Sequence, residues 1–106
     1  MFSDLSLASK VKTLREYYNK LFNSQSKAHG SDYMLVHDEI KNRLEECESY
    51  TELGVKQGTT LATAVLQNIK TVRAYDIDLN PYNKCKHLFD MYVKENTIDF
   101  QIHQVD

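Results

Sequence analysis

The residues whose types and spacing could bind a ligand lie in one stretch near the middle of the chain. Glu52 is followed by Gly54 and Gly58, and then by the hydroxyl-bearing pair Thr59 and Thr60. A strand that ends on an acidic residue and breaks into a glycine turn lets the backbone approach a ligand with no Cβ in the way. A helix that begins after Gly58 would add free N–H donors and a partial positive charge. We therefore interpret residues 52–60 as a ligand-binding loop.

A second acidic residue has the spacing of a ribose contact. Asp76 ends the next expected strand, 22 positions after Gly54. A carboxylate about 20 residues beyond a glycine loop accepts the ribose hydroxyls in dinucleotide-binding folds. The loop departs from that fingerprint because Lys56 replaces the second glycine, and it departs from a phosphate-binding loop because no lysine directly precedes its threonines. Glu52 beside the loop disfavours a phosphate and favours a ligand that carries an ammonium or sulfonium group.

The hydrophobic pattern predicts alternating strands and helices in the second half of the chain. The expected strands cover residues 50–53, 71–76 and 98–105, and the expected helices cover residues 59–69 and 82–95. Strands that alternate with helices of this length are typical of βαβ units and a parallel sheet with right-handed crossovers. We expect an α/β protein with a Rossmann-like three-layer half-fold, strand order 3-2-1, and the ligand at the carboxyl ends of the strands.

The first half of the chain predicts two helices that form a cap laid against the sheet. Apolar residues at helical spacing indicate a helix over residues 5–22, a polar loop over residues 23–30 and a second helix over residues 32–47. The side chains expected to form the buried side of the second helix are Tyr33, Val36, Ile40, Leu44 and Cys47. We therefore divide one compact unit into a helical cap, residues 1–48, and a Rossmann-like cofactor-binding half-domain, residues 49–106.

The composition disfavours several classes of partner. The net charge is −2 and the basic residues alternate with acids, so we expect no nucleic-acid partner. No apolar run reaches the roughly 18 residues of a membrane span, and the N-terminus lacks a signal-peptide pattern. Cys47 and Cys85 are too few for a disulfide framework, so we expect packed, reduced thiols in a cytoplasmic protein. The four histidines lack ligand spacing, so we expect no metal site.

Three segments resemble the motifs of class I S-adenosylmethionine-dependent methyltransferases. Residues 52–60 are similar to the family's first motif in the form E-x-G-x-x-x-G-[ST], with Lys56 where many members carry glycine. Residues 74–78 resemble the second motif, and residues 100–106 resemble the third strand and its terminal acid. The order and spacing of the three segments match the family, and the resemblance covers residues 33–106.

The resemblance implies S-adenosylmethionine as the cofactor and gives roles to six residues. Those around the methionine part would be Glu52, Gly54 and Gly58, and those around the ribose and adenine would be Asp76, Ile77 and Asp106. In that family, the residues that choose the methyl acceptor follow the fourth strand. The resemblance therefore assigns no catalytic residue here, and the acceptor is unknown.

The number of strands leaves two hypotheses open. The family's sheet has seven strands in the order 3-2-1-4-5-7-6, whereas three are expected here. The chain is either part of a longer enzyme, which we favour, or a short protein that pairs the open edge of its first strand with a second copy. In the second case it could be a non-catalytic assembly or regulatory protein. A nicotinamide-dependent enzyme is a third possibility, disfavoured by the missing middle glycine.

Overall fold

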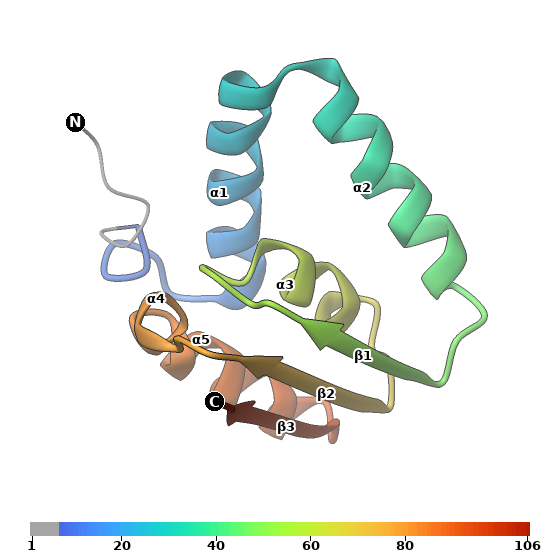
Figure 1. Cartoon of the computed structure of the whole chain (residues 1–106), viewed down its shortest axis with the longest axis vertical. Coiled ribbons are helices and arrows are strands. Elements are labelled where there is room, and N and C mark those ends of the chain that lie inside the picture. Colours follow the sequence, from blue (N-terminus) through green and yellow to red (C-terminus); the bar gives the residue numbers. More distant parts are fainter. Residues whose placement is uncertain (1–6) are drawn as a thin grey trace.

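The fold is built on a three-stranded parallel sheet (Figure 1). The computed structural model describes residues 7–106, apart from the side chains of residues 29 and 31–34. The strands are β1 (Ser49–Leu53), β2 (Thr71–Asp76) and β3 (Asp99–Gln104). They lie in the order β1-β2-β3, so β2 is the central strand and hydrogen-bonds to both neighbours. The expected α/β architecture with a parallel sheet is confirmed.

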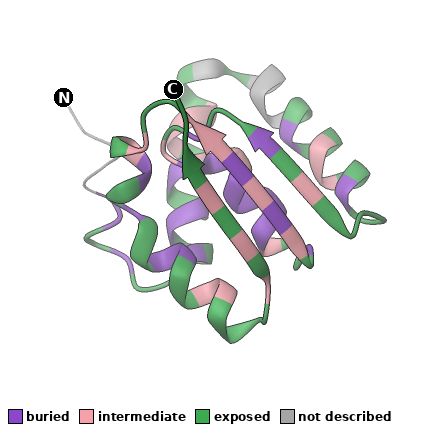
Figure 2. Cartoon of the chain, turned by 60° about the horizontal axis from the view of Figure 1, so that its bottom comes forward, coloured by how far each residue is buried: buried purple, intermediate pink, exposed green. Residues whose placement is uncertain are grey.

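The helices of the described chain lie on one side of the sheet. They are α1 (Leu14–His29), α2 (Ser31–Leu44), α3 (Thr59–Leu66), α4 (Asn80–Asn83) and α5 (Lys86–Glu95). Right-handed crossovers between strands that are added in one direction pass over the same face. Figure 2 shows helices behind the strands, with α2 beside the outer edge of β1. α1 packs mainly against α3 and α2 and also contacts α5, and α2 packs against α1 and α3. The N-terminal helices thus rest mainly on the crossover helices, and not on the sheet as expected.

Strand alternation decides which side chains enter the core. Val72 and Ala74 of β2 are completely buried under the helices. Glu52 of β1 and Ile102 of β3 are the register partners of Ala74, so they share this face. The largest side chains that fill the space between the helices and the sheet are Leu14, Tyr17, Leu21, Leu61, Tyr82, Leu88 and Phe89.

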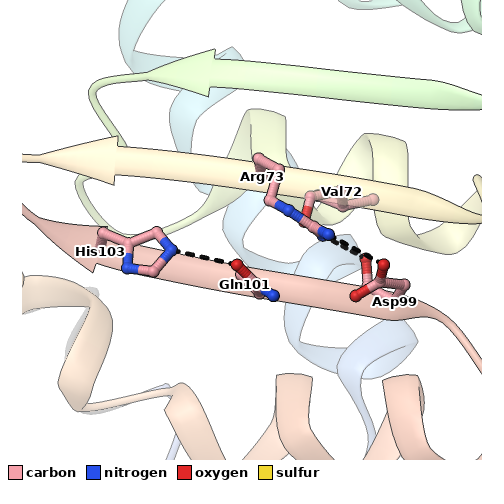
Figure 3. Close-up of polar contacts among 5 residues, drawn as sticks. All are labelled: Val72, Arg73, Asp99, Gln101 and His103. Atoms are coloured by element: carbon pink, nitrogen blue, oxygen red, sulfur yellow. Dashed lines mark hydrogen bonds and ion pairs between the residues drawn. The ribbon is translucent and has the colours of Figure 1, made fainter.

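No described helix covers the other face of the sheet. It carries polar pairs in place of an apolar layer, and Figure 3 shows Arg73 bonded to Asp99 at 2.8 Å and Gln101 beside His103 at 3.3 Å. Leu53 on the same face is 82% exposed. Parallel sheets are usually covered on both faces. The described residues form one layer of helices on one sheet, so the expected three-layer arrangement is wrong for residues 7–106.

The first helix starts later than the sequence predicted. Thr13 caps α1, because its Oγ1 accepts a hydrogen bond from the Glu16 N–H at 3.1 Å. The Glu16 carboxylate accepts a hydrogen bond from the Lys12 N–H at 3.0 Å. This reciprocal arrangement resembles a capping box and fixes the helix start at Leu14. Residues 5 and 6 of the expected helix lie outside the described residues.

The prediction of a loop over residues 23–30 is wrong. α1 continues to His29, because its polar sequence contains no glycine or proline before Gly30. Gly30 ends the helix with φ of 83°, and its N–H donates to the Ser26 carbonyl at 2.8 Å. Gly30 is thus the one residue between α1 and α2. Figure 1 shows the two helices joined by a sharp bend.

The buried side of α2 differs from the expected one. Val36 is 57% exposed and Cys47 is exposed, whereas His37 is buried. Ile40 is partly buried and Leu44 is buried, as expected. His37 thus takes the inward position that was expected for Val36, and α2 ends before Cys47. The side chain of Tyr33 lies outside the described residues.

The remaining boundaries differ by a few residues. α3 stops at Leu66, because the chain turns through Asn68 at φ of 60°. The helix expected over residues 82–95 is two helices, since the chain leaves helical geometry around Cys85. Across residues 7–106, no helix is both long enough and apolar enough to cross a membrane.

Candidate functional site

The loop between β1 and α3 has positive φ at three residues. Gly54, Lys56 and Gly58 have φ of 90°, 52° and 88°. The Gly54 N–H donates to the Tyr75 carbonyl at 2.7 Å, and the Gly58 N–H donates to the Val55 carbonyl at 2.9 Å. Residues with a Cβ rarely adopt such angles, which explains why glycine occupies positions 54 and 58. Lys56 adopts a left-handed conformation at a cost of about 1–2 kcal/mol.

The two loop glycines have different surroundings. A Cβ added to Gly54 would meet no atom within 4 Å. A Cβ added to Gly58 would lie 3.0 Å from Cζ and 3.1 Å from Cε1 of Phe89. Gly58 is therefore needed where the start of α3 packs on α5, whereas the space beside Gly54 is open.

The Asp76 carboxylate holds the loop in place. Its Oδ2 accepts hydrogen bonds from the N–H of Val55 at 2.7 Å and of Lys56 at 3.2 Å, and its Oδ1 accepts from the Asp78 N–H at 3.2 Å. These bonds, that of Val55 foremost, keep the pKa of Asp76 below its usual value. A carboxylate has about four lone-pair positions. A contact with both ribose hydroxyls would thus require Asp76 to release a loop N–H.

The carbonyl of Gln57 anchors the other end of the loop. The Tyr17 hydroxyl of α1 donates to it at 2.8 Å, and the Cys85 thiol approaches it at 3.6 Å. Burial raises the pKa of Cys85 to about 11, so the thiol is protonated at neutral pH and is not a nucleophile. The expected packed thiol is confirmed at Cys85, but it is wrong at Cys47, which is exposed.

A cavity of about 520 Å³ lies beside the loop at the carboxyl end of β1. Its lining residues are Gln25, His37, Leu53, Gly54, Val55, Lys56, Gln57, Thr59 and Thr60. Thr59 at the start of α3 donates through Oγ1 to Oε1 of Gln25 at 2.8 Å, which ties α1 to the cavity. Small-molecule sites usually have volumes of about 300–1,000 Å³, so the cavity has the size of a ligand site.

His37 contributes a buried ring to the cavity wall. The ring lies edge-on to Phe22 with centroids 5.2 Å apart, and its Nδ1 is 3.5 Å from Oγ1 of Thr63. Burial, followed by the charge of Lys41, lowers the pKa of His37. The imidazole is therefore neutral at neutral pH.

Glu52 combines burial with an incomplete set of hydrogen bonds. It is only 7% exposed, and its Oε1 accepts a hydrogen bond from the Tyr50 hydroxyl at 2.6 Å. Its Oε2 is buried and has no hydrogen-bond partner among the residues that the structure describes. Burial raises the pKa of Glu52 to about 7; the Tyr50 hydrogen bond opposes this shift, and the charge of Asp76 adds to it. The carboxyl group is therefore poised between its neutral and charged forms.

The residues predicted for the site are only partly brought together. Glu52 and Gly54 lie at the carboxyl end of β1, and Asp76 reaches them from β2. Ile77 follows β2 and is 71% exposed. Asp106 is exposed beyond β3, which is separated from β1 by the central strand. The glycine loop is thus bonded to the carboxylate of Asp76, and Asp106 follows Val105, whose N–H donates to the Asp76 carbonyl at 2.9 Å.

Two cavity residues were not assigned to the site by sequence reasoning. Gln25 fell in the expected loop, and His37 was considered only with the other histidines, as a metal ligand. The absence of glycine and proline from residues 23–29 could have extended the first helix to Gly30 and so placed Gln25 on it. The spacing of His37 and Leu44 could have indicated that they share one face of a helix.

The described residues contain no group of three or more His, Cys, Asp or Glu side chains that could hold a metal ion. The residues that line the cavity offer the loop backbone, neutral polar side chains and the ammonium of Lys56.

No protein-family model matches the sequence, and searches of the curated proteins and of the solved structures also find no match.

Proposed function

We propose that the chain is a Rossmann-like S-adenosylmethionine-binding domain of the methyltransferase type. The observation that carries the proposal is the pairing of an open glycine backbone at Gly54 with a buried, incompletely bonded carboxyl at Glu52. The open backbone at Gly54 allows a ligand to pass close to the loop. The carboxyl of Glu52 provides a site for positive charge near the end of β1.

The cavity and the exposed residues around it fit the parts of this cofactor. The cavity volume of about 520 Å³ is sufficient for a ligand of this size. Ile77 presents an exposed apolar side chain beside the loop-bound Asp76, where an adenine ring could pack. When bound, the cofactor would supply an activated methyl group, and the protein's main task would be alignment with an acceptor.

Asp76 has a positioning role in this proposal. Because its carboxylate holds the N–H groups of Val55 and Lys56, it shapes the backbone against which the ligand lies. A single ribose hydroxyl could use its remaining lone pair. Asp106 follows Val105, whose N–H donates to the Asp76 carbonyl at 2.9 Å, so it could contact the adenine near the end of β2.

Calorimetric titration with S-adenosylmethionine and with S-adenosylhomocysteine tests the proposal. We expect saturable binding by the folded protein, and weaker binding by Asp76→Ala by about 1.5–3 kcal/mol, the usual effect of losing hydrogen bonds to a charged group. Asp90→Ala is the matched control, since Asp90 is an exposed acid paired only with Lys86 on the outside of α5. A folded sample that binds neither ligand at millimolar concentration would refute the proposal.

A second candidate is a non-catalytic assembly or regulatory protein that forms a homodimer through β1. This strand lies at the edge of the sheet, and no strand in residues 7–106 pairs with its outer side. An exposed edge is a template for pairing with another chain. Sedimentation of the full chain distinguishes the two functions: a monomer that binds S-adenosylmethionine contradicts the dimer, and a dimer without binding favours it.

A further inference from the structure

The wall of the cavity beside the glycine loop carries positive charge. Of the nine residues that line it, Lys56 alone has a charged side chain at neutral pH, since none is an acid and burial lowers the pKa of His37. α3 begins at Thr59 beside the cavity, with no side-chain cap and no acid in its first turn. The partial positive charge of this helix start has the same sign as Lys56. A ligand in the cavity therefore meets positive charge from the wall.

The carboxyl groups near the loop do not cancel the charge of Lys56. Its ammonium forms no ion pair with any residue that the structure describes. Asp76 holds the backbone N–H of Lys56, but it does not line the cavity. Glu52 does not line the cavity either, and burial raises its pKa to about 7, so about half of it is neutral at neutral pH. A cationic group in the cavity therefore gains no carboxylate contact from the lining residues.

The backbone conformation of Lys56 indicates that its side chain has a function. Three residues other than glycine have positive φ: Lys56, Asn68 and Thr97. Asn68 and Thr97 each follow the last residue of a helix cap, where a left-handed residue is usual. Lys56 lies in the ligand loop, where glycine would adopt φ of 52° without strain. Strained residues of this kind gather at ligand sites, and what lysine adds here is its charged side chain.

We propose that Lys56 makes the site select an uncharged sulfur over a sulfonium, so that S-adenosylhomocysteine binds more tightly than S-adenosylmethionine. This inference rests on the proposed function, because it concerns the same cavity. The two ligands share the adenosine and the amino-acid tail, and they differ by one methyl group and one positive charge at sulfur. The ammonium of Lys56 attracts the carboxylate of the shared tail equally in both ligands, and it repels only the sulfonium. The domain therefore retains the demethylated form of the cofactor.

Calorimetric titration of the full chain with each ligand at low salt measures this preference. We expect the wild type to bind S-adenosylhomocysteine about fivefold more tightly, the size of one repulsion between solvated charges. Lys56→Gly removes the charge and relieves the backbone, so its two affinities should be nearly equal. The gain should come from tighter binding of S-adenosylmethionine. Lys56→Arg keeps the charge and should keep the preference.

The matched control is Lys94→Gln. Lys94 is an exposed lysine in the last turn of α5, shortly before β3 begins, and so lies at the opposite end of the parallel sheet from the glycine loop. Its loss changes the net charge of the protein as much as Lys56→Gly does. We expect the preference of Lys94→Gln to equal that of the wild type, because only a charge at the cavity acts on the sulfur.

Salt separates the effect of charge from the effect of the methyl group's size. Between about 0.01 M and 1 M salt, the screening length falls from about 30 Å to about 3 Å. The preference of the wild type for S-adenosylhomocysteine should therefore nearly disappear at the higher concentration. A preference that is the same at both concentrations overturns the inference, since the size of the methyl group would then decide it.

The outcomes separate this inference from the proposed function. A folded wild type that binds neither ligand refutes both. Binding of both ligands with equal affinity at low salt overturns the role of Lys56 and leaves the cofactor site intact. A preference that persists in folded Lys56→Gly or disappears in Lys56→Arg also overturns that role. If a variant does not fold, the salt dependence of the wild type decides alone.

Discussion

The carboxylate of Asp76 on β2 accepts a hydrogen bond from the backbone N–H of Val55 in the glycine loop, at 2.7 Å. The two residues are 21 positions apart, and the bond joins the end of the second strand to the turn after the first. An acid at this position was predicted from the spacing of the glycine loop and the second strand, but as a ligand group. Its structural role is to hold the loop in the shape that forms the cavity wall.

The first prediction concerns this bond. Asp76→Asn keeps one oxygen acceptor but loses the charge, so the N–H groups of Val55 and Lys56 should be held less tightly. We expect a loss of about 1–2 kcal/mol in the free energy of unfolding. Amide hydrogen exchange at Val55 and Lys56 should accelerate beyond the change expected from the lost stability alone.

The control for Asp76→Asn is Asp99→Asn on β3, where an exposed ion pair with Arg73 contributes little to stability. If hydrogen exchange in the loop is unchanged in Asp76→Asn, the carboxylate does not hold the loop in solution.

The second prediction compares the two loop glycines. Gly58→Ala should destabilise more than Gly54→Ala, although both positions have positive φ. Each substitution introduces backbone strain of about 1–2 kcal/mol. Gly58→Ala also places a Cβ 3.0 Å from Phe89, which adds a further 1–3 kcal/mol, on the order of other overpacked sites. Chemical denaturation of both variants measures the difference.

A double-mutant cycle tests the cause of this difference. Phe89→Leu shortens the side chain that Gly58→Ala would contact, so the double variant should lose less stability than the two single losses added together. Additive losses of stability would show that the contact with Phe89 is not the cause of the destabilisation by Gly58→Ala. Gly54→Ala combined with Phe89→Leu should be additive, because a Cβ at Gly54 has no neighbour within 4 Å.

The strands and the loop could be predicted because their signals are local. Thr71–Asp76 matches its expected bounds, since an alternating apolar pattern is followed directly by polar turn residues. The glycines mark the loop because positive φ excludes most other residues. Lys56 shows the limit of this reasoning: it has φ of 52°, and nothing in its residue type indicates that conformation.

The walls of the cavity could not be predicted because they depend on tertiary packing. Gln25 reaches Thr59 only because α1 continues through a polar segment and lies along α3. His37 is buried because α2 rotates to place it next to Thr63, one residue away from the expected stripe at Val36. The bonds of Asp76 to the loop also depend on the register of β1 and β2, which the sequence pattern does not encode.

The third prediction concerns a strained helix end. Thr97 follows the last turn of α5 with φ of 54°, where glycine is the usual residue, and the Ile98 N–H donates to the Val93 carbonyl at 3.0 Å. Left-handed geometry is especially unfavourable for a β-branched residue. Thr97→Gly should therefore stabilise the protein by about 1 kcal/mol in thermal or chemical denaturation.

Asn68 provides a matched comparison for Thr97→Gly. It also has a left-handed conformation, with φ of 60°, but its Oδ1 accepts a hydrogen bond from the Tyr92 hydroxyl at 2.7 Å. Asn68→Gly relieves the backbone strain but loses this hydrogen bond, so we expect little net change in the free energy of unfolding. A gain in stability for Asn68→Gly as large as that for Thr97→Gly would mean that the Tyr92 bond contributes nothing.

The fourth prediction is the pH dependence of stability due to Glu52. Burial raises the pKa of its carboxyl from 4.5 in the unfolded chain to about 7 in the folded protein, so folding takes up a proton between these values. The contribution of the neutral carboxyl is complete below pH 4.5 and is lost as the pH rises through 7. A shift of this size corresponds to about 3 kcal/mol at most.

Glu52→Gln removes this dependence while keeping an oxygen that can accept the Tyr50 hydroxyl hydrogen bond. We expect its free energy of unfolding to match that of the wild type near pH 5 and to exceed it by up to about 3 kcal/mol at pH 8. Asp76 does not interfere, because its pKa is lowered from 3.8 and its contribution is lost only at more acidic pH. Urea denaturation from pH 4.5 to pH 8 measures both curves. If the two proteins keep a constant difference across this range, the Glu52 carboxyl does not titrate there, and its burial in solution is less complete than in the structure.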